Sequence, residues 1–140
     1  MPKLKGLKPM MRRIDERIDV NSDHGPLPGT DLTTDFAVRW TGYLHIATIG
    51  TRTLALSSDD GSRLTVDGKV EIRNGGNHGA NEEVANLTLT AGDHPIMIEY
   101  FQGSVTFSCR LSDKTDGGRV LDGHDLLHHP DPTLDQPAGR

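Results

Sequence analysis

Alternation of apolar and polar side chains with a period of two is the feature of this sequence that most limits its fold. From Val105 to Leu111 the chain reads Val-Thr-Phe-Ser-Cys-Arg-Leu. Because successive side chains of a strand point to opposite faces, this run predicts a half-buried strand. Seven similar runs precede it, at 36–40, 43–47, 53–57, 63–66, 69–73, 84–89 and 94–101.

Turn-forming residue pairs separate these runs, at Thr41-Gly42, Ile49-Gly50, Asp67-Gly68, Ala91-Gly92 and Gln102-Gly103. Asp67-Gly68 predicts a two-residue hairpin, because a type I′ turn needs a positive φ at both central residues. About eight strands without a long amphipathic helix predict an all-β fold, an antiparallel β-sandwich or barrel.

The two ends of the chain differ from this middle part. Residues 12–20 are compatible with a short helix or an edge strand that packs Ile14, Ile18 and Val20. Residues 112–140 are rich in Asp, Gly, His and Pro, and predict a strap across the barrel followed by a tail. We therefore expect a single domain over residues 1–140, with its core at about 12–111.

Composition excludes several classes of function. The net charge is −5, which argues against nucleic acid or an anionic membrane as partner. A single cysteine rules out an internal disulfide and a four-cysteine zinc site. Apolar runs stay below the roughly 18 residues of a membrane helix, and the basic start lacks the apolar stretch of a secretory signal.

Several blocks of the sequence resemble the protective-antigen domain family, found in anthrax protective antigen, yeast flocculins and bacterial glycoside hydrolases. The blocks are Phe-Ala-Val-Arg-Trp-Thr-Gly-Tyr-Leu at 36–44, Ser-Ser-Asp-Asp-Gly-Ser-Arg-Leu at 57–64, Val-Asp-Gly at 66–68 and the stretch 91–101. The resemblance covers about residues 12 to 111. It implies a β-sandwich with barrel character and an extracellular or cell-surface module that binds carbohydrate, in several members through calcium.

The adjacent carboxylates Asp59 and Asp60 are the most informative polar residues. In an extended strand they would point to opposite faces, whereas in calcium-binding members of the resembled family this peptide is cis and both point to one side. Calcium takes six to eight oxygens, so a second, glycine-rich loop at 74–79 is expected to supply more. The predicted metal ligands are Asp59, Asp60 and Asn77. The predicted ligand-binding residues are Arg73, Asn74, Gly75, Gly76, His78 and Gly79.

The Asp-Asp-Gly sequence allows two interpretations, a metal site or a common turn. In the turn, the carboxylates bind backbone N–H groups instead of a metal.

The sequence departs from the family pattern at three places. Thr65 replaces an aromatic residue, Arg73 replaces an acidic one, and the last strand lacks a tryptophan. Sugar recognition would then rest on metal and hydrogen bonds, and Arg73 could pair with Asp60 or with an acidic sugar.

The remaining histidine, aromatic, cysteine and carboxylate side chains give weaker indications of a function. His124 and His128 are one helical turn apart, but a zinc site lacks further evident ligands. Trp40 and Tyr100 are expected in the core, and Cys109 as an inert buried thiol. Adjacent carboxylates do not give the separation of roughly 5 Å or more that glycoside hydrolysis requires, so no catalytic residues are predicted.

The sequence thus predicts a non-catalytic carbohydrate-binding module with calcium as cofactor and a glycan or polysaccharide as partner, without membrane insertion, as part of a larger multidomain protein. The alternative is a structural or protein-interaction module on the same scaffold without a functional metal.

Overall fold

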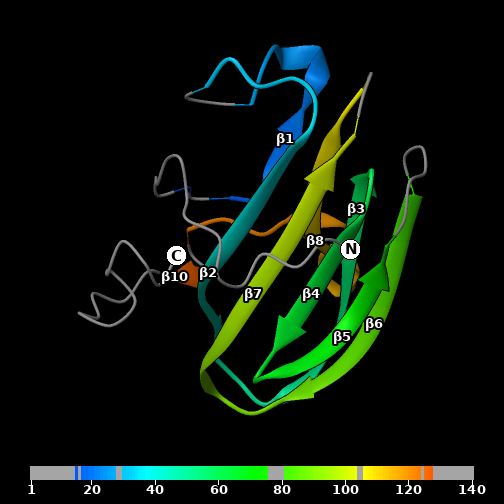
Figure 1. Ribbon diagram of the computed structural model, residues 1–140. Coiled ribbons are helices and arrows are strands. Elements are labelled where there is room, and N and C mark those ends of the chain that lie inside the picture. The colour runs from blue at the N-terminus through cyan, green and yellow to red at the C-terminus, as the bar shows by residue number, and fades with distance from the viewer. Residues whose placement is uncertain are drawn as a thin grey trace.

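The computed structural model describes residues 15, 17–27, 30–75, 81–103, 106–123 and 125–127. In this part of the chain, β-strands form two antiparallel sheets that pack face to face (Figure 1). The predicted all-β antiparallel sandwich is therefore confirmed. None of the helices within these ranges is long and apolar enough to cross a membrane.

The first sheet has the strand order β1-β8-β3-β6, and β9 pairs with β8. Its strands are β1 (Asp19–Asn21), β3 (Gly50–Asp59), β6 (Asn81–Leu89), β8 (Ser108–Asp113) and β9 (Arg119–Val120). The second sheet has the order β10-β2-β7-β4-β5. Its strands are β2 (Phe36–Ile46), β4 (Ser62–Val66), β5 (Lys69–Asn74), β7 (Gly92–Gln102) and β10 (Leu126–Leu127). Two 3₁₀ helices, η1 (Ser22–His24) and η2 (Lys114–Asp116), lie between strands.

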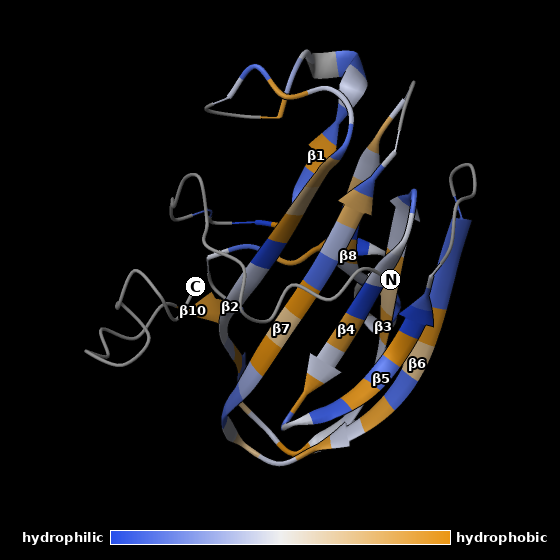
Figure 2. Ribbon diagram, viewed as in Figure 1, coloured by the Kyte–Doolittle hydropathy of each residue, from blue (hydrophilic) through white to orange (hydrophobic). Residues whose placement is uncertain are grey.

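The core lies between the two sheets and follows the predicted alternation, which Figure 2 shows as orange and blue bands along the strands. Tyr100 is fully buried and stacks on the partly buried Trp40 with ring centroids 6.4 Å apart. Cys109 is also fully buried, and burial raises the pKa of its thiol. The core positions expected for Trp40 and Tyr100 and the buried state of Cys109 are confirmed.

The predicted turn at Thr41-Gly42 is wrong, because β2 runs through it without interruption. Gly42 is needed there for a different reason. A Cβ atom at this position would lie 2.9 Å from the carbonyl oxygen of Leu127 in the neighbouring strand β10. The missing side chain thus allows β10 to pair with β2 rather than allowing the chain to turn.

Other local predictions hold with shifted boundaries. Asp67 and Gly68 have φ values of 52° and 80°, which confirms the hairpin between β4 and β5. Of residues 12–20, the last two form the edge strand β1 with Asn21, and Ile18 and Val20 are buried. Strand β8 begins at Ser108 instead of 105. Ile14 and Val105 lie outside the described residues.

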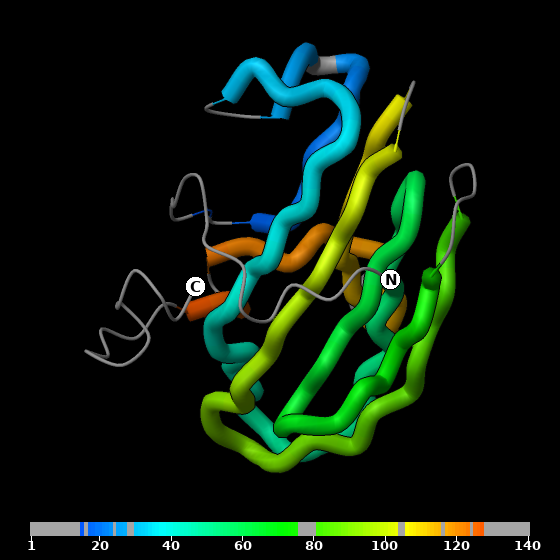
Figure 3. Tube along the Cα trace, in the orientation of Figure 1, coloured from blue at the N-terminus to red at the C-terminus, as the bar shows by residue number. Residues whose placement is uncertain are grey.

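The segment after β8 connects the two sheets. Strand β9 pairs with β8 of the first sheet, and β10 pairs with β2 of the second. Leu121, between them, is 1% exposed and completes the core. Figure 3 shows this segment in orange, ending beside β2. His124, His128 and His129 fall outside the described ranges.

Candidate functional site

The candidate site lies at the end of the sandwich that is uppermost in Figure 1. Strands β3, β5 and β7 all end there, so the loops that follow them begin at the same end. The residues that directly follow these strands, Asp60 and Gly61 after β3, Gly75 after β5 and Gly103 after β7, belong to the described residues. The fold therefore brings together segments that are about forty residues apart in the chain.

Asp59 is the last residue of β3, and its peptide bond to Asp60 is cis, as the family resemblance implied. The hydroxyl of Thr106 donates a hydrogen bond to Asp59 Oδ2 at 2.9 Å. The hydroxyl of Tyr100 donates to the backbone carbonyl of Asp59 at 2.5 Å, and burial raises the pKa of this tyrosine. Both the side chain and the backbone of Asp59 are thus held by residues of β7 and the segment after it.

Asp60 is held by the same segment. Its Oδ2 accepts a hydrogen bond from the backbone N–H of Gly103 at 2.8 Å, and the residue is only 8% exposed. A Cβ atom on Gly103 would come within 3.2 Å of this oxygen, so glycine suits the close approach. The Asp60 carbonyl accepts from Ser58 Oγ at 2.8 Å, and Ser58 Oγ lies 2.6 Å from Ser62 Oγ.

The residues of the second predicted loop have different surroundings. The buried amide of Asn74 donates to the carbonyls of Leu56 at 3.2 Å and Asn81 at 2.9 Å, which ties β5 to β3 and β6. Arg73 and Gly75 are exposed. With Ser62 and Arg63 they line a hollow of about 250 Å³. The other predicted residues of this loop, Gly76, Asn77, His78 and Gly79, lie outside the described residues.

Sequence reasoning missed Thr106 and Gly103 as partners of the two carboxylates. The sequence predicts the turn at Gln102-Gly103, but the contact with Asp60, 43 residues away, depends on how the strands are arranged in space. Tyr100 gave a partial signal, since an aromatic residue with a hydroxyl in a core pattern needs a hydrogen-bond acceptor.

The donor set suits a hard cation. Asp59 and Asp60 supply carboxylate oxygens, which calcium prefers, and Asp59 Oδ1 accepts no hydrogen bond from the described residues. Within those residues, no group of three or more His, Cys, Asp or Glu side chains is placed to hold a metal. Calcium here would need further oxygens from backbone, amide or hydroxyl groups, or from a bound ligand.

The fold and the paired carboxylates at one end define an antiparallel β-sandwich with a loop-based polar site. The sequence matches the PA14 domain over residues 3–119, and the chain belongs to this family. The resemblance to protective-antigen domains is therefore confirmed.

The chain is similar to several proteins of known sequence or structure. The anti-sigma-I factor RsgI3 of Acetivibrio thermocellus is 35% identical over 101 residues, which is 71% of this chain and 16% of that protein. A solved anti-sigma factor domain-containing protein is 31% identical, with a TM-score of 0.76 over 86% of this chain and 43% of the other. A PA14 sugar-binding domain from an RTX adhesin is 29% identical, with a TM-score of 0.60 over 72% of this chain and 60% of the other. The chain thus spans less than half the length of the first two relatives.

Proposed function

We propose that this domain is a non-catalytic carbohydrate-binding module that binds sugar through a calcium ion held by Asp59 and Asp60. The observation that carries the proposal is the shared end of the sandwich, where Thr106 and Gly103 hold both carboxylates in place. Calcium, when bound, would supply positions that sugar hydroxyls can occupy. The similarity to a PA14 sugar-binding domain supports the same ligand class.

The residues of this chain have separate roles in the proposal. Asp59 is the primary ligand, because one of its oxygens accepts no hydrogen bond within the described ranges. Asp60 supplies a second carboxylate from a nearly buried position. From the predicted loop at 74–79, Asn77 is proposed as a further ligand. A site with only two protein carboxylates should bind calcium weakly, with a Kd of roughly 10⁻⁴–10⁻³ M, as in extracellular modules. We also propose an extracellular or cell-surface location within a larger protein.

Calcium titration of the melting temperature tests this proposal. Calcium at about 100 times its Kd adds about 2.7 kcal/mol to stability, and we expect a rise in Tm of roughly 5–10 °C for a chain of this size. Asp59→Asn should remove the rise. Asp31→Asn is the matched control, because Asp31 is exposed in the loop between β1 and β2.

A glycan array with and without chelator then tests the ligand. Binding that disappears with chelator supports the proposed mechanism, and sugar binding that persists contradicts it. If calcium leaves the Tm of the wild-type chain unchanged and no glycan binds, the alternative of a structural or protein-interaction module without a metal takes its place.

A further inference from the structure

A row of charged side chains crosses the outer face of the second sheet. Strand register pairs Arg39 of β2 with Glu99 of β7, Glu99 with Arg63 of β4, and Arg63 with Arg73 of β5. Neighbouring strands are about 4.8 Å apart, so the row is roughly 14 Å long. Three guanidinium groups and one carboxylate give this arginine row (Arg39, Glu99, Arg63, Arg73) an excess of positive charge on a chain whose net charge is −5.

The single carboxylate of the row is already paired. Arg63 donates from both Nε and Nη2 to Glu99 Oε1, and the Glu99 side chain is only 6% exposed. Arg39 and Arg73 form no ion pair or hydrogen bond with any described residue. Arg39 Nε is moreover buried without a hydrogen-bond partner among those residues. A buried donor without an acceptor is costly, which applies to Arg39. Arg73 is exposed and carries a charge without a counterion among the described residues. Both arginines are therefore suited to an anion from outside the chain.

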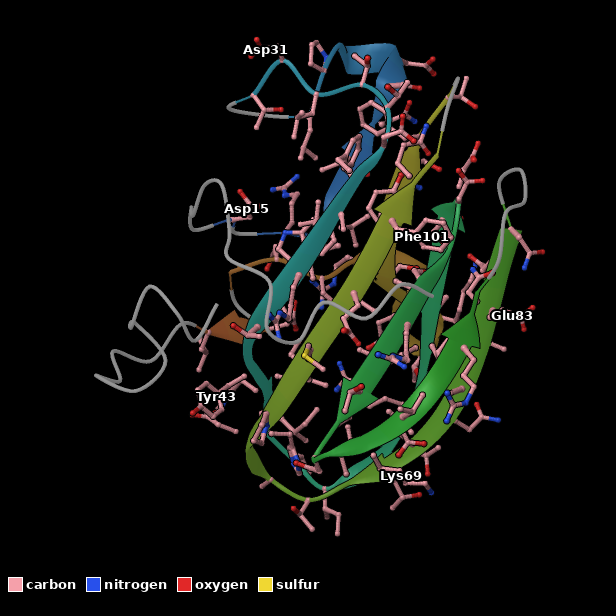
Figure 4. All side chains as sticks on the ribbon, viewed as in Figure 1. Asp15, Asp31, Tyr43, Lys69, Glu83 and Phe101 are labelled. Atoms are coloured by element: carbon pink, nitrogen blue, oxygen red, sulfur yellow. The ribbon has the colours of Figure 1, made fainter. Side chains whose placement is uncertain are left out.

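The arginine row is continuous with the Asp59–Asp60 loop. Arg63 and Arg73 line the hollow of about 250 Å³ together with Ser62, and Ser62 reaches the Asp60 carbonyl through Ser58. Phe101 is two residues after Glu99 on the same outward face, and its N–H donates to the carbonyl of Gly61 at 2.9 Å. Figure 4 shows Phe101 at the loop end of β7. A ligand at the loop could therefore extend over Phe101 to the arginines.

We propose that the arginine row is an anion subsite and that the glycan bound by this domain is acidic, with carboxylate groups on its sugar rings. The inference rests on the proposed function, since it names the ligand class of the same site. A planar carboxylate matches the two-donor edge of a guanidinium group, and carboxylate oxygens also suit calcium. The length of the row allows more than one carboxylate of a repeating polymer to be bound.

Paired oligosaccharides test the inference. The probes are a glucuronate-containing oligosaccharide and the same compound after reduction of its carboxyl groups, titrated into the intact chain by calorimetry. We expect the acidic probe to bind about tenfold more tightly than the reduced one, a difference of about 1.4 kcal/mol. Added salt should weaken binding of the acidic probe alone, because exposed charges are screened.

Variants at the two unpaired arginines locate the effect. Arg73→Gln should weaken binding of the acidic probe by up to about fivefold, and Arg39→Gln combined with it should remove the preference over the reduced probe. Arg63 is left intact, because its loss would leave Glu99 buried and unpaired. Lys69→Gln removes the same charge from the far end of β5 and should change neither affinity. A melting curve for each variant verifies that it folds.

The outcomes separate this inference from the proposed function. Equal affinity for the two probes, or an effect of Lys69→Gln as large as that of Arg73→Gln, overturns the anion subsite even where calcium-dependent sugar binding holds. Tighter binding of a sulfated counterpart overturns the choice of carboxylate. A preference for the acidic probe that needs Arg39 and Arg73 but survives chelator and Asp59→Asn supports the subsite and contradicts the calcium mechanism.

Discussion

Asp59 depends on one side chain from a distant part of the chain. Thr106 Oγ1 donates to Asp59 Oδ2 at 2.9 Å across a sequence separation of 47 residues. Residues that orient a ligand carboxylate typically change metal affinity by about 10–100-fold when they are lost. The hydroxyl of Thr106 is thus a positioning group for the proposed calcium site, although it carries no charge.

Thr106→Val tests this role at the scale of one residue. Valine keeps the branched shape and removes only the hydroxyl, so we expect a change in unfolding free energy of less than about 1 kcal/mol at this exposed position. Calcium affinity should fall by about tenfold or more, measured as a shift of the calcium dependence of Tm. Thr33→Val, in the exposed loop before β2, is the control. An unchanged calcium midpoint would show that Thr106 does not position the carboxylate.

At the scale of elements, Gly42 decides whether the last strand can pair. Gly42→Ala places a Cβ atom 2.9 Å from the Leu127 carbonyl oxygen, a backbone atom that cannot rotate away. Overpacking of this kind costs about 1–3 kcal/mol, and we expect that loss in urea unfolding. Gly50→Ala in β3 is the matched control, because no atom lies within 4 Å of its Cβ position. Equal stability of the two variants would contradict the close approach of β10.

A histidine links two strand connections, the β4–β5 hairpin turn and the β6–β7 crossing between the sheets, at the opposite end from the candidate site. His94 Nδ1 lies 2.8 Å from Asp67 Oδ2 in the turn between β4 and β5, and Nε2 lies 2.8 Å from the Thr90 carbonyl oxygen. Both partners only accept hydrogen bonds, so the doubly protonated ring satisfies both. The hydrogen bond to Thr90 and then that to Asp67 raise the pKa of His94.

This raised pKa predicts a direction for the pH dependence of stability. Because the folded chain binds the proton more tightly, the contribution of His94 is fully present below about pH 6.5, the usual value for an unfolded chain. It is lost as the pH rises through the raised folded value. We expect the Tm difference between wild type and His94→Gln to shrink over that window in low-salt buffer. A difference that grows with pH would contradict the assignment.

At the scale of the whole molecule, the sequence predicted what local periodicity can encode. Strand alternation and the Asp67-Gly68 turn were recognisable because each depends on neighbouring residues. The turn predicted at Gly42 is wrong because glycine is needed there for another purpose. It leaves room for the carbonyl of Leu127, which is 85 residues later in the chain. The sequence does not predict the roles of Thr106 and Gly103 for the same reason, since their contacts with Asp59 and Asp60 depend on β3 and β7, strands of different sheets, ending at the same end of the sandwich.

The connection between the two sheets is also a property of the whole molecule. The segment from β9 to β10 contacts both sheets, and Arg119 fixes it with hydrogen bonds of 2.8 and 3.1 Å to the two Asp125 carboxylate oxygens. These bonds lower the pKa of Asp125. Leu121, 1% exposed, donates its N–H to the Leu111 carbonyl at 3.2 Å. The strap thus completes a core that the sheets leave open.

Leu121→Ala tests whether the strap belongs to the cooperative fold. Truncating a buried leucine leaves a cavity and costs about 2–5 kcal/mol, and we expect that loss in urea unfolding, with one transition and an unchanged slope. Leu127→Ala, at a half-buried position of β10, should cost less. A loss below about 1 kcal/mol for Leu121→Ala, or a separate early transition, would show that the strap unfolds independently of the two sheets. The expected result would make residues 119–127 part of the smallest stable unit of this domain.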